Sequence, residues 1–259
     1  MSYQILENGN VIAPSREIKN VGEYDVVVCG GGLAGFGSAL SAARHGAKVI
    51  IIDKATALGG LATVGLVPIP LDIPIGISQE MLDRLEEVDG HTRRNSDPEK
   101  HKLILDRMVK EANIDVLLDT LIVDAVMCGN QVRGVVIESK SGRQVIFGKR
   151  FIDCTGDADL AYLAGCECMS GRPEDGKHQA CSIDFRLGGV DYNKYLASDL
   201  KRDDPQWVKL IVLDRKHTHQ RPKQNIGALR FSFSRARQRH YLVIRPRQRF
   251  YLHWYPLVC

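Results

Sequence analysis

The sequence predicts an α/β fold with a central parallel sheet and a three-stranded antiparallel β-meander. Two runs of β-branched residues, "YDVVVCG" and "KVIIID", enclose a segment whose apolar residues recur at helical spacing. Continuous apolar runs of this kind are typical of parallel strands that are covered on both faces. Further along, turn residues separate several short apolar runs, as they do in antiparallel hairpins. The 259 residues are enough to bury a sizeable core.

Three glycines lie at the first turn. Gly30, Gly32 and Gly35 form the pattern G-x-G-x-x-G between the first strand and a helix expected over residues 33–45. In dinucleotide-binding proteins the first glycine allows a tight turn, the second lets the backbone approach a pyrophosphate, and the third lets helix and strand pack closely. The helix N-terminus also favours an anion.

Asp53 ends the second strand, 23 residues after Gly30. Its carboxylate can accept hydrogen bonds from ribose hydroxyls and would repel a 2′-phosphate. The unit therefore predicts a Rossmann-like dinucleotide site that disfavours NADP. The glycine pattern by itself leaves NAD and FAD as alternatives.

The segment after Asp53 differs from a plain NAD-binding domain. A second diglycine, Gly59-Gly60, follows the second strand, and Pro68, Pro70 and Pro74 predict an extended loop where a helix would normally begin.

Two helices are expected after this loop. The first covers residues 79–88 with Ser78 as N-cap, and the second begins with a capping box of Ser96 and Glu99 that has Pro98 in its first turn. The apolar stripe of the second helix is expected at Leu103, Ile104, Met108 and Ala112.

Residues 114–154 are interpreted as five short strands. Gly129-Asn130 joins the second to the third, and Ser141-Gly142 joins the third to the fourth. The fifth strand, "RFIDC", leads into Thr155-Gly156-Asp157, and Asp157 is expected to be the N-cap of a short helix "ADLAYLAG". Cys29 and Cys154 end the two central strands and are interpreted as core residues.

Four stretches, in this order, resemble the FAD-dependent oxidoreductases of the glutathione-reductase-like two-dinucleotide-fold group. Within that group they are similar to the A-type flavoproteins of heterodisulfide reductase. The stretches are "EYDVVVCGGGLAGFGSALSAARHGAKVIIIDK", "LGGLATVGLV", "SGRQVIFGKRFIDCTGDADLAYLAG" and "FRLGGVD", and they span about residues 17–204. The resemblance implies FAD as cofactor, a meander in place of the crossover helix, and hydride transfer between a substrate and flavin N5.

The resemblance also implies cofactor-binding roles for particular residues. The first glycine group would contact the FAD pyrophosphate, Asp53 the adenosine ribose, and the second diglycine with Thr63 the phosphate and ribityl side. The T-G-D element at residues 155–157 would contact the ribityl or phosphate region. The complete predicted set is Gly30, Gly32, Gly35, Asp53, Lys54, Gly59, Gly60, Thr63, Thr155, Gly156 and Asp157. No catalytic residue is assigned.

No metal site is expected. Cys166, Cys168, His178 and Cys181 form a loose cluster without the usual metal-ligand spacing, and the closely spaced cysteines of an Fe–S site are missing from the sequence. The seven cysteines without an export signal, and the lack of a long apolar window, predict a soluble cytoplasmic protein with no membrane partner.

The charge distribution divides the chain. From residue 205 onward there are twelve Lys or Arg and one acid, which makes this tail +11 and, with the chain total of +4, residues 1–204 −7. We expect an N-terminal arm at 1–20, an FAD-binding domain at 21–204 with an insertion at 59–112, and a basic tail at 205–259. The tail is interpreted as a nucleic-acid-binding segment, a strand-rich extension, or a truncated or frame-shifted end, and its abrupt composition favours the last.

Function is left with three alternatives. The favoured one is an FAD-dependent oxidoreductase with a small-molecule substrate and an electron acceptor, both unidentified, and no nucleic-acid partner. The second is a non-catalytic FAD- or ADP-binding fragment that lacks the segments facing the substrate and the isoalloxazine ring. The third is an NAD-binding protein like thiazole synthase.

Overall fold

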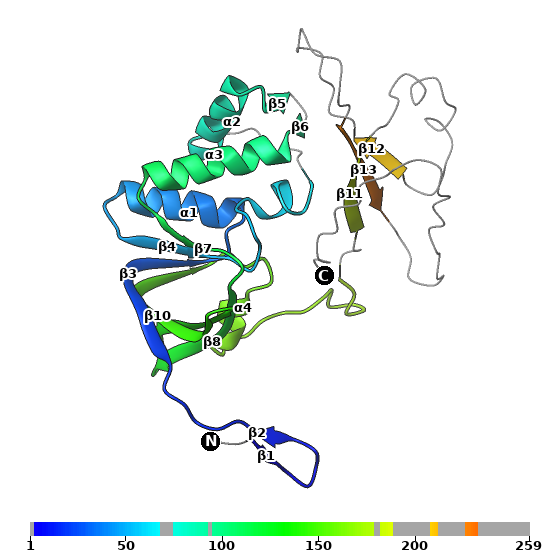
Figure 1. Ribbon diagram of the computed structural model, residues 1–259. Helices are drawn as coiled ribbons and strands as arrows, with labels where there is room; N and C mark the ends of the chain where they lie inside the picture. The colour runs from blue at the N-terminus through cyan, green and yellow to red at the C-terminus, as the bar shows by residue number, and fades with distance from the viewer. Residues whose placement is uncertain are drawn as a thin grey trace.

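The computed structural model describes residues 3–67, 75–92 and 95–178, together with three strands at 182–188, 208–211 and 226–232. Its largest element is a six-stranded sheet with the strand order β7-β4-β3-β10-β9-β8. The first four strands in this order run parallel, and the last two are joined antiparallel. Their bounds are β3 Lys19–Cys29, β4 Val49–Ile52, β7 Asp115–Leu117, β8 Leu121–Cys128, β9 Gln131–Ser139 and β10 Gly142–Asp153. The predicted α/β fold with a parallel sheet and an antiparallel meander is confirmed (Figure 1).

Strand β10 corrects the expected count of five strands in this region to four. The predicted fourth and fifth strands are one strand, which pairs antiparallel with β9 up to Phe147 and parallel with β3 down to Asp153. Gly148 does not break it. A Cβ at Gly148 would stand 2.7 Å from Cγ2 of Val27 on β3, so the glycine makes room for close strand packing. A glycine in a strand has this meaning as often as it marks a turn.

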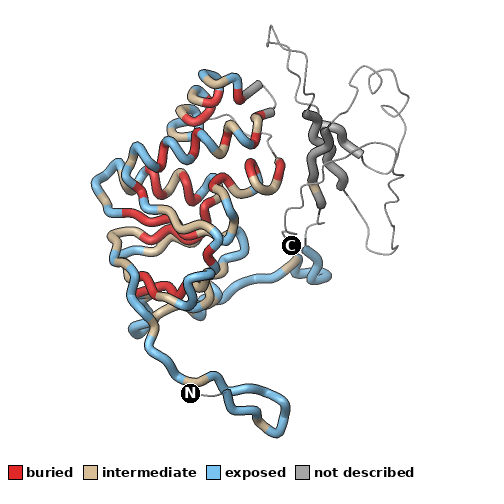
Figure 2. The backbone as a smooth tube through the Cα atoms, viewed as in Figure 1, coloured by how far each residue is buried: buried red, intermediate tan, exposed pale blue. Residues whose placement is uncertain are grey.

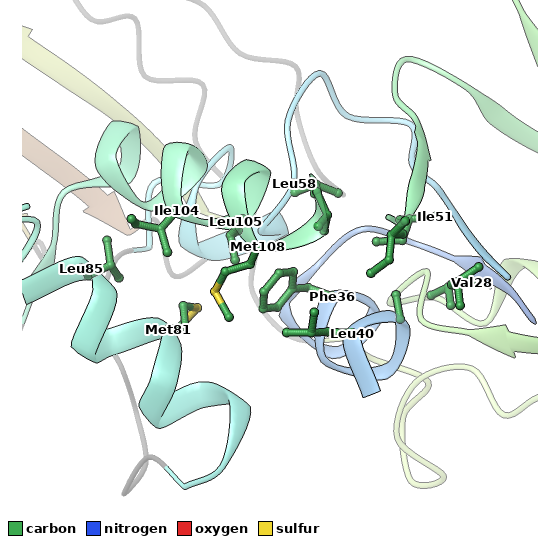
Figure 3. Close-up of a cluster of buried hydrophobic side chains, with 14 of the residues drawn as sticks. Val28, Phe36, Leu40, Ile51, Leu58, Met81, Leu85, Ile104, Leu105 and Met108 are labelled. Atoms are coloured by element: carbon green, nitrogen blue, oxygen red, sulfur yellow. The ribbon is translucent and has the colours of Figure 1, made fainter. Parts of the chain in front are cut away.

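Three helices cover one face of the sheet. They are α1 Leu33–Arg44, α2 Ile77–Glu87 and α3 Pro98–Glu111, and Figure 1 shows them stacked on the same side of β3 and β4. Figure 3 shows Phe36 and Leu40 of α1 directed toward Leu105 and Met108 of α3. Met81 of α2 belongs to the same buried cluster, which includes side chains from β3 and β4 and so joins the helices to the sheet.

The second face is covered by the meander and by α4, Asp159–Leu163. Ile50 and Ile52 of β4 share a buried cluster with Val135 and Ile137 of β9, although β3 and β10 lie between these strands in the sheet. The sheet therefore bends so that the meander covers its own second face. Leu160 of α4 closes this cluster, and Figure 2 shows the buried residues in the interior on both sides of the sheet.

Both helix starts in the insertion differ from the prediction. α2 begins at Ile77 after Gly76, so Ser78 lies inside the first turn, where its Oγ donates to the carbonyl of Ile75. The N-cap of α3 is Asp97, whose Oδ1 accepts from the amide of Glu99 at 2.9 Å. The predicted capping box of Ser96 and Glu99 is therefore wrong by one residue.

The buried stripe of α3 is also rotated from the expected one. Ile104 and Met108 are buried as predicted, but Leu103 is 43% exposed, and Leu105 and Val109 take its place in the core. Ala112 is the C-cap and packs against the same cluster.

The remaining elements are small. The N-terminal arm contains a hairpin of β1 Gln4–Ile5 and β2 Val11–Ile12, and β5 His91–Thr92 pairs with β6 Asn95–Ser96. A short 3-10 helix covers Gly60–Ala62. A separate sheet has the order β11-β13-β12, with bounds β11 Ser182–Gly188, β12 Val208–Ile211 and β13 Ile226–Ser232.

Most of the basic tail, on which the nucleic-acid interpretation depends, lies outside the described residues. In the described parts of the chain, no helix has both the length and the hydropathy that a bilayer crossing requires.

Candidate functional site

The carboxyl ends of three neighbouring parallel strands meet at one edge of the sheet. Gly30 follows β3, Asp53 follows β4, and Thr155 lies just beyond β10. Ligands of open α/β sheets bind at this edge, beside the strand where the chain order reverses, and β3 is that strand because α1 leads to β4 on one side while β10 lies on the other. A narrow hollow of about 50 Å³ opens here, lined by Gly30, Ile52, Asp53, Lys54, Thr120, Leu121, Ile122, Thr155 and Asp159.

Two of the motif glycines are required by close backbone contacts. Gly30 has φ +101°, and a Cβ there would clash with the carbonyl of Cys154 and stand 2.8 Å from the amide nitrogen of Thr155. A Cβ at Gly35 would overlap the carbonyl oxygen of Gly30. These contacts match the turn and packing roles that the pattern predicts for the two glycines.

Gly32 differs, because the space beside it is open. A Cβ at Gly32 would meet no atom of the described residues within 4 Å. Gly32 is the N-cap of α1 and has no side chain that could satisfy the first amides of the helix, and the first turn contains only Leu33, Ala34 and Gly35. An uncharged turn with unoccupied amides is suited to an anion.

The second diglycine lies directly against the first motif. The amide of Gly59 donates to the carbonyl of Gly31 at 2.8 Å, and a Cβ at Gly60 would be 3.0 Å from Cα of Gly32. Thr63 is fully buried, and its Oγ1 donates to the carbonyl of Leu58 at 2.5 Å. The Thr63 hydroxyl therefore stabilises the loop that carries the diglycine.

The carboxylate of Asp53 connects the second strand to the glycine loop. Its Oδ2 accepts from the amide of Gly31, and its Oδ1 accepts from the amide of Ala55 at 2.6 Å. A carboxylate offers about four acceptor positions, so further hydrogen bonds to a ligand hydroxyl are possible. Lys54, the next residue, is exposed at the rim of the hollow.

The start of α4 corrects the role expected for Asp157. The N-cap of α4 is Ala158, with φ +58°, and Asp157 is exposed before it. The amide of Asp159 donates to Oγ1 of Thr155 at 2.8 Å, so Thr155 does the capping that was expected of Asp157. The reason is that two left-handed residues, Gly156 and Ala158, turn the chain between Thr155 and the helix.

Several residues of this edge were missed by the sequence analysis. Thr120, Leu121 and Ile122 line the hollow from the start of β8, which local sequence cannot place beside Gly30. Asp153 is a second omission, because its carboxylate accepts hydrogen bonds from Thr155 and from the amide of Ala161. An acid at the end of an otherwise apolar strand is the signal that could have found it, since a half-buried carboxylate needs donors.

The two strand-end cysteines lie in the interior. Cys29 is buried, and burial raises the pKa of its thiol to about 12, with smaller contributions from the charge of Asp153 and from Cys154. Cys29 is therefore a neutral thiol, in agreement with its interpretation as a core residue. Cys154 is half-buried and packs against the helix-side cluster.

The cysteines after α4 are placed differently. Cys166 and Cys168 are exposed, and Nε2 of His178 lies 3.3 Å from Oγ of Ser170. Cys181 is outside the described residues. Within the parts of the chain that are described, no group of three or more His, Cys, Asp or Glu side chains could hold a metal ion.

A second, larger hollow of about 440 Å³ lies between α3 and the edge strand β7. It is lined by Asp106, Val109, Lys110, Ile114, Asp115, Val116 and Leu118, and it includes none of the predicted site residues. The chemistry implied by the glycine motifs therefore belongs to the smaller hollow.

A bent parallel sheet with glycine loops at its carboxyl edge, an anion-accepting helix start and an acid at the second strand defines a dinucleotide-binding protein. The sequence model of the family FAD dependent oxidoreductase matches residues 25–254. The chain belongs to this family, and FAD is its cofactor. The match begins at the strand that carries the first motif and extends beyond residue 204, where the resemblance was expected to end.

The residues present fit FAD. The open side of Gly32, the amides at the start of α1 and the remaining acceptor positions on Asp53 are the features that a pyrophosphate and a ribose require. The contacts of each of the eleven predicted residues with the cofactor stay predictions.

Solved structures resemble the fold. CabE, an aromatic hydroxylase from angucycline biosynthesis, aligns with a TM-score of 0.51 and 12% identity over 86% of this chain and 46% of that chain. A geranylgeranyl bacteriochlorophyll reductase-like protein from Thermoplasma acidophilum has a TM-score of 0.47 and 16% identity, over 82% and 57%. A flavocytochrome c3 fumarate reductase has a TM-score of 0.42 and 20% identity, over 52% and 34%.

The chain thus spans about a third of the flavocytochrome and less than half of CabE. The similarity to CabE shows the fold. No curated protein matches the sequence.

Proposed function

We propose that this protein transfers a hydride between a small-molecule substrate and N5 of the flavin ring of FAD, and that a separate electron acceptor then reoxidises the flavin. The redox chemistry is supplied by the bound flavin, while the chain binds and orients it. The observation that carries the proposal is the meeting of Gly30, Asp53 and Thr155, which come from three separate segments, around one hollow at the carboxyl edge of the sheet.

The proposal assigns the pyrophosphate to the start of α1. The open space beside Gly32 lets the backbone approach the phosphates, and the first-turn amides point along the helix axis toward them. Gly59 and Gly60, which lie against Gly31 and Gly32, extend the same surface.

The adenosine ribose is assigned to Asp53. Its carboxylate is held by two backbone amides, and such a fixed acceptor orients ribose hydroxyls without losing side-chain freedom on binding. Lys54, exposed at the rim, would lie near the negative phosphates. Gly156 and Asp157, exposed beyond Thr155, would face the ribityl side of the same cofactor.

The first test is retention of FAD. The purified 259-residue protein is incubated with FAD and desalted, and its visible absorption spectrum is recorded. We expect flavin bands to remain with the protein. Anaerobic mixing with a panel of hydride donors would then identify the substrate class by bleaching of these bands.

Gly32→Ala is the matched site variant and Gly37→Ala its control. Both positions are in or next to α1, and a Cβ at either would meet no atom of the described residues within 4 Å. Gly32→Ala would place a methyl group where the pyrophosphate approaches, so we expect at least about a 10-fold weaker FAD affinity, equivalent to about 1.4 kcal/mol. Gly37→Ala should keep the wild-type affinity. Wild-type protein that stays colourless after FAD addition would contradict the proposal.

A further inference from the structure

The carboxylate of Asp153 holds the chain between the end of β10 and α4. Its Oδ1 accepts from the amide of Thr155 at 3.0 Å and from Oγ1 of Thr155 at 2.7 Å. Its Oδ2 accepts from the amide of Ala161 at 2.9 Å. Oγ1 of Thr155 in turn accepts from the amide of Asp159 at 2.8 Å. One side chain thus bonds to both ends of this segment.

The segment depends on these bonds because little else in it is regular. α4 is five residues long, which is too short to be stable as an isolated helix. Gly156 has φ +91° and Ala158 has φ +58°, and a non-glycine residue stays in such a conformation only where its surroundings impose it. The hydrogen bonds of Asp153 and Thr155 are the surroundings that do so here.

The same segment is locked to the first glycine motif. The amide of Cys154 donates to the carbonyl of Cys29 at 2.6 Å. Cα of Gly30 lies so close to Cys154 and Thr155 that a Cβ there would clash with their backbone. A shift of the backbone at residues 154–155 would therefore change the glycine loop, and the reverse also holds.

We propose that Asp153 is a positioning residue for the cofactor site, acting through Thr155. Its carboxylate sets the backbone of residues 155–157 against Gly30 and so fixes the direction in which Gly156 and Asp157 face the cofactor. This inference rests on the proposed function, since it concerns how the same site is ordered for FAD. Nothing in it requires Asp153 to touch the cofactor.

The test uses four variants of the full chain. Asp153→Asn leaves a donor amide facing one of the backbone amides, and Thr155→Val removes the hydroxyl at nearly constant volume, whereas Thr155→Ser keeps it. Asp97→Asn is the matched control, because Asp97 also accepts from helix-start amides, those of Glu99 and Lys100, but in α3. FAD affinity, the visible circular dichroism of bound flavin and the melting temperature without FAD are measured for each.

We expect Asp153→Asn and Thr155→Val to weaken FAD binding at least about 10-fold and to change the flavin circular dichroism. Thr155→Ser should recover most of the affinity that Thr155→Val loses. Asp97→Asn should lower the melting temperature without either effect. If Asp153→Asn binds FAD as tightly as Asp97→Asn, the positioning role is overturned.

A second measurement separates this inference from the proposed function. Amide hydrogen exchange of residues 155–161 is recorded without FAD, and we expect Asp153→Asn to speed it at least about 10-fold relative to Asp97→Asn. Unchanged exchange would overturn the inference even if FAD binds. Wild-type protein that binds no FAD would overturn the proposed function, and the exchange rates would still decide whether Asp153 orders the segment.

Discussion

Cα of Gly30 lies directly against the backbone carbonyl of Cys154, which joins the loop after β3 to the loop after β10. Gly30→Ala would combine a Cβ clash at this contact with a φ of +101°, which alanine adopts only under strain. We expect the free energy of unfolding to fall by about 2–4 kcal/mol. FAD binding should be lost together with it. Urea denaturation and FAD titration measure the two effects, and an unchanged unfolding midpoint would show that the contact is not made.

Gly35 and Gly37 form a matched pair in α1. A Cβ at Gly35 would overlap the carbonyl oxygen of Gly30, whereas one at Gly37 would meet no described atom within 4 Å. Gly35→Ala should therefore destabilise the protein by about 2 kcal/mol through overpacking. Gly37→Ala should stabilise it by about 0.5–1 kcal/mol through helix propensity. Thermal and urea unfolding of both variants check the opposite signs, and equal effects would contradict the helix-strand contact.

Leu105 and Leu103 test which face of α3 is buried. Leu105 is fully buried and Leu103 is 43% exposed. Leu105→Ala should cost about 2–5 kcal/mol, because it leaves a cavity among the helices. Leu103→Ala should cost less than about 1 kcal/mol. The reverse order of unfolding midpoints would support the stripe that the periodicity of the sequence predicted.

Tyr24 joins β3 to the edge strand β7. Its hydroxyl donates to Oδ2 of Asp115 at 2.9 Å, and burial, this hydrogen bond and the charge of Asp115 raise its pKa from 10.0 to about 12. The raised pKa means that the folded state favours the protonated tyrosine. Its stabilising effect is therefore complete below pH 10.0 and is lost as the pH rises through about 12.

Tyr24→Phe removes this titration. We expect the stability difference between wild type and Tyr24→Phe to shrink between about pH 9 and about pH 12, as measured by urea denaturation. Tyr3→Phe is the control, since Tyr3 is 66% exposed at the N-terminal arm. A stability difference that stays constant across this range would show that the Tyr24 hydroxyl does not have the environment described.

The features that were predicted correctly are the ones that local sequence encodes. The buried runs became β3 and β4, the helical spacing became α1, and the turn residues at Gly129 and Gly142 placed the meander. The contact of Gly30 and Gly35 followed from their spacing. Each of these depends on residues within a few positions of one another, so a single sequence is enough.

The features that were missed depend on contacts between distant segments. Periodicity favoured Leu103 for the core, but the angle at which α3 packs on α1 and α2 turned Leu105 inward instead. The helix caps moved by a residue because several neighbouring polar side chains could serve, and only the path of the incoming chain selects Asp97.

By itself, the sequence determined the α/β class, the glycine loops and the acid after β4, because strand and helix periods and glycine geometry are local properties of the chain. Tertiary structure decided the rest of the site. Only the pairing of β3 with β10 places Thr155 against Gly30, and only the folded turn gives the start of α4 to Thr155 and Asp153, leaving Asp157 exposed. The physical reason is that the contact between the two loops joins residues more than a hundred positions apart, where backbone packing between strands, and no local preference, selects the partners.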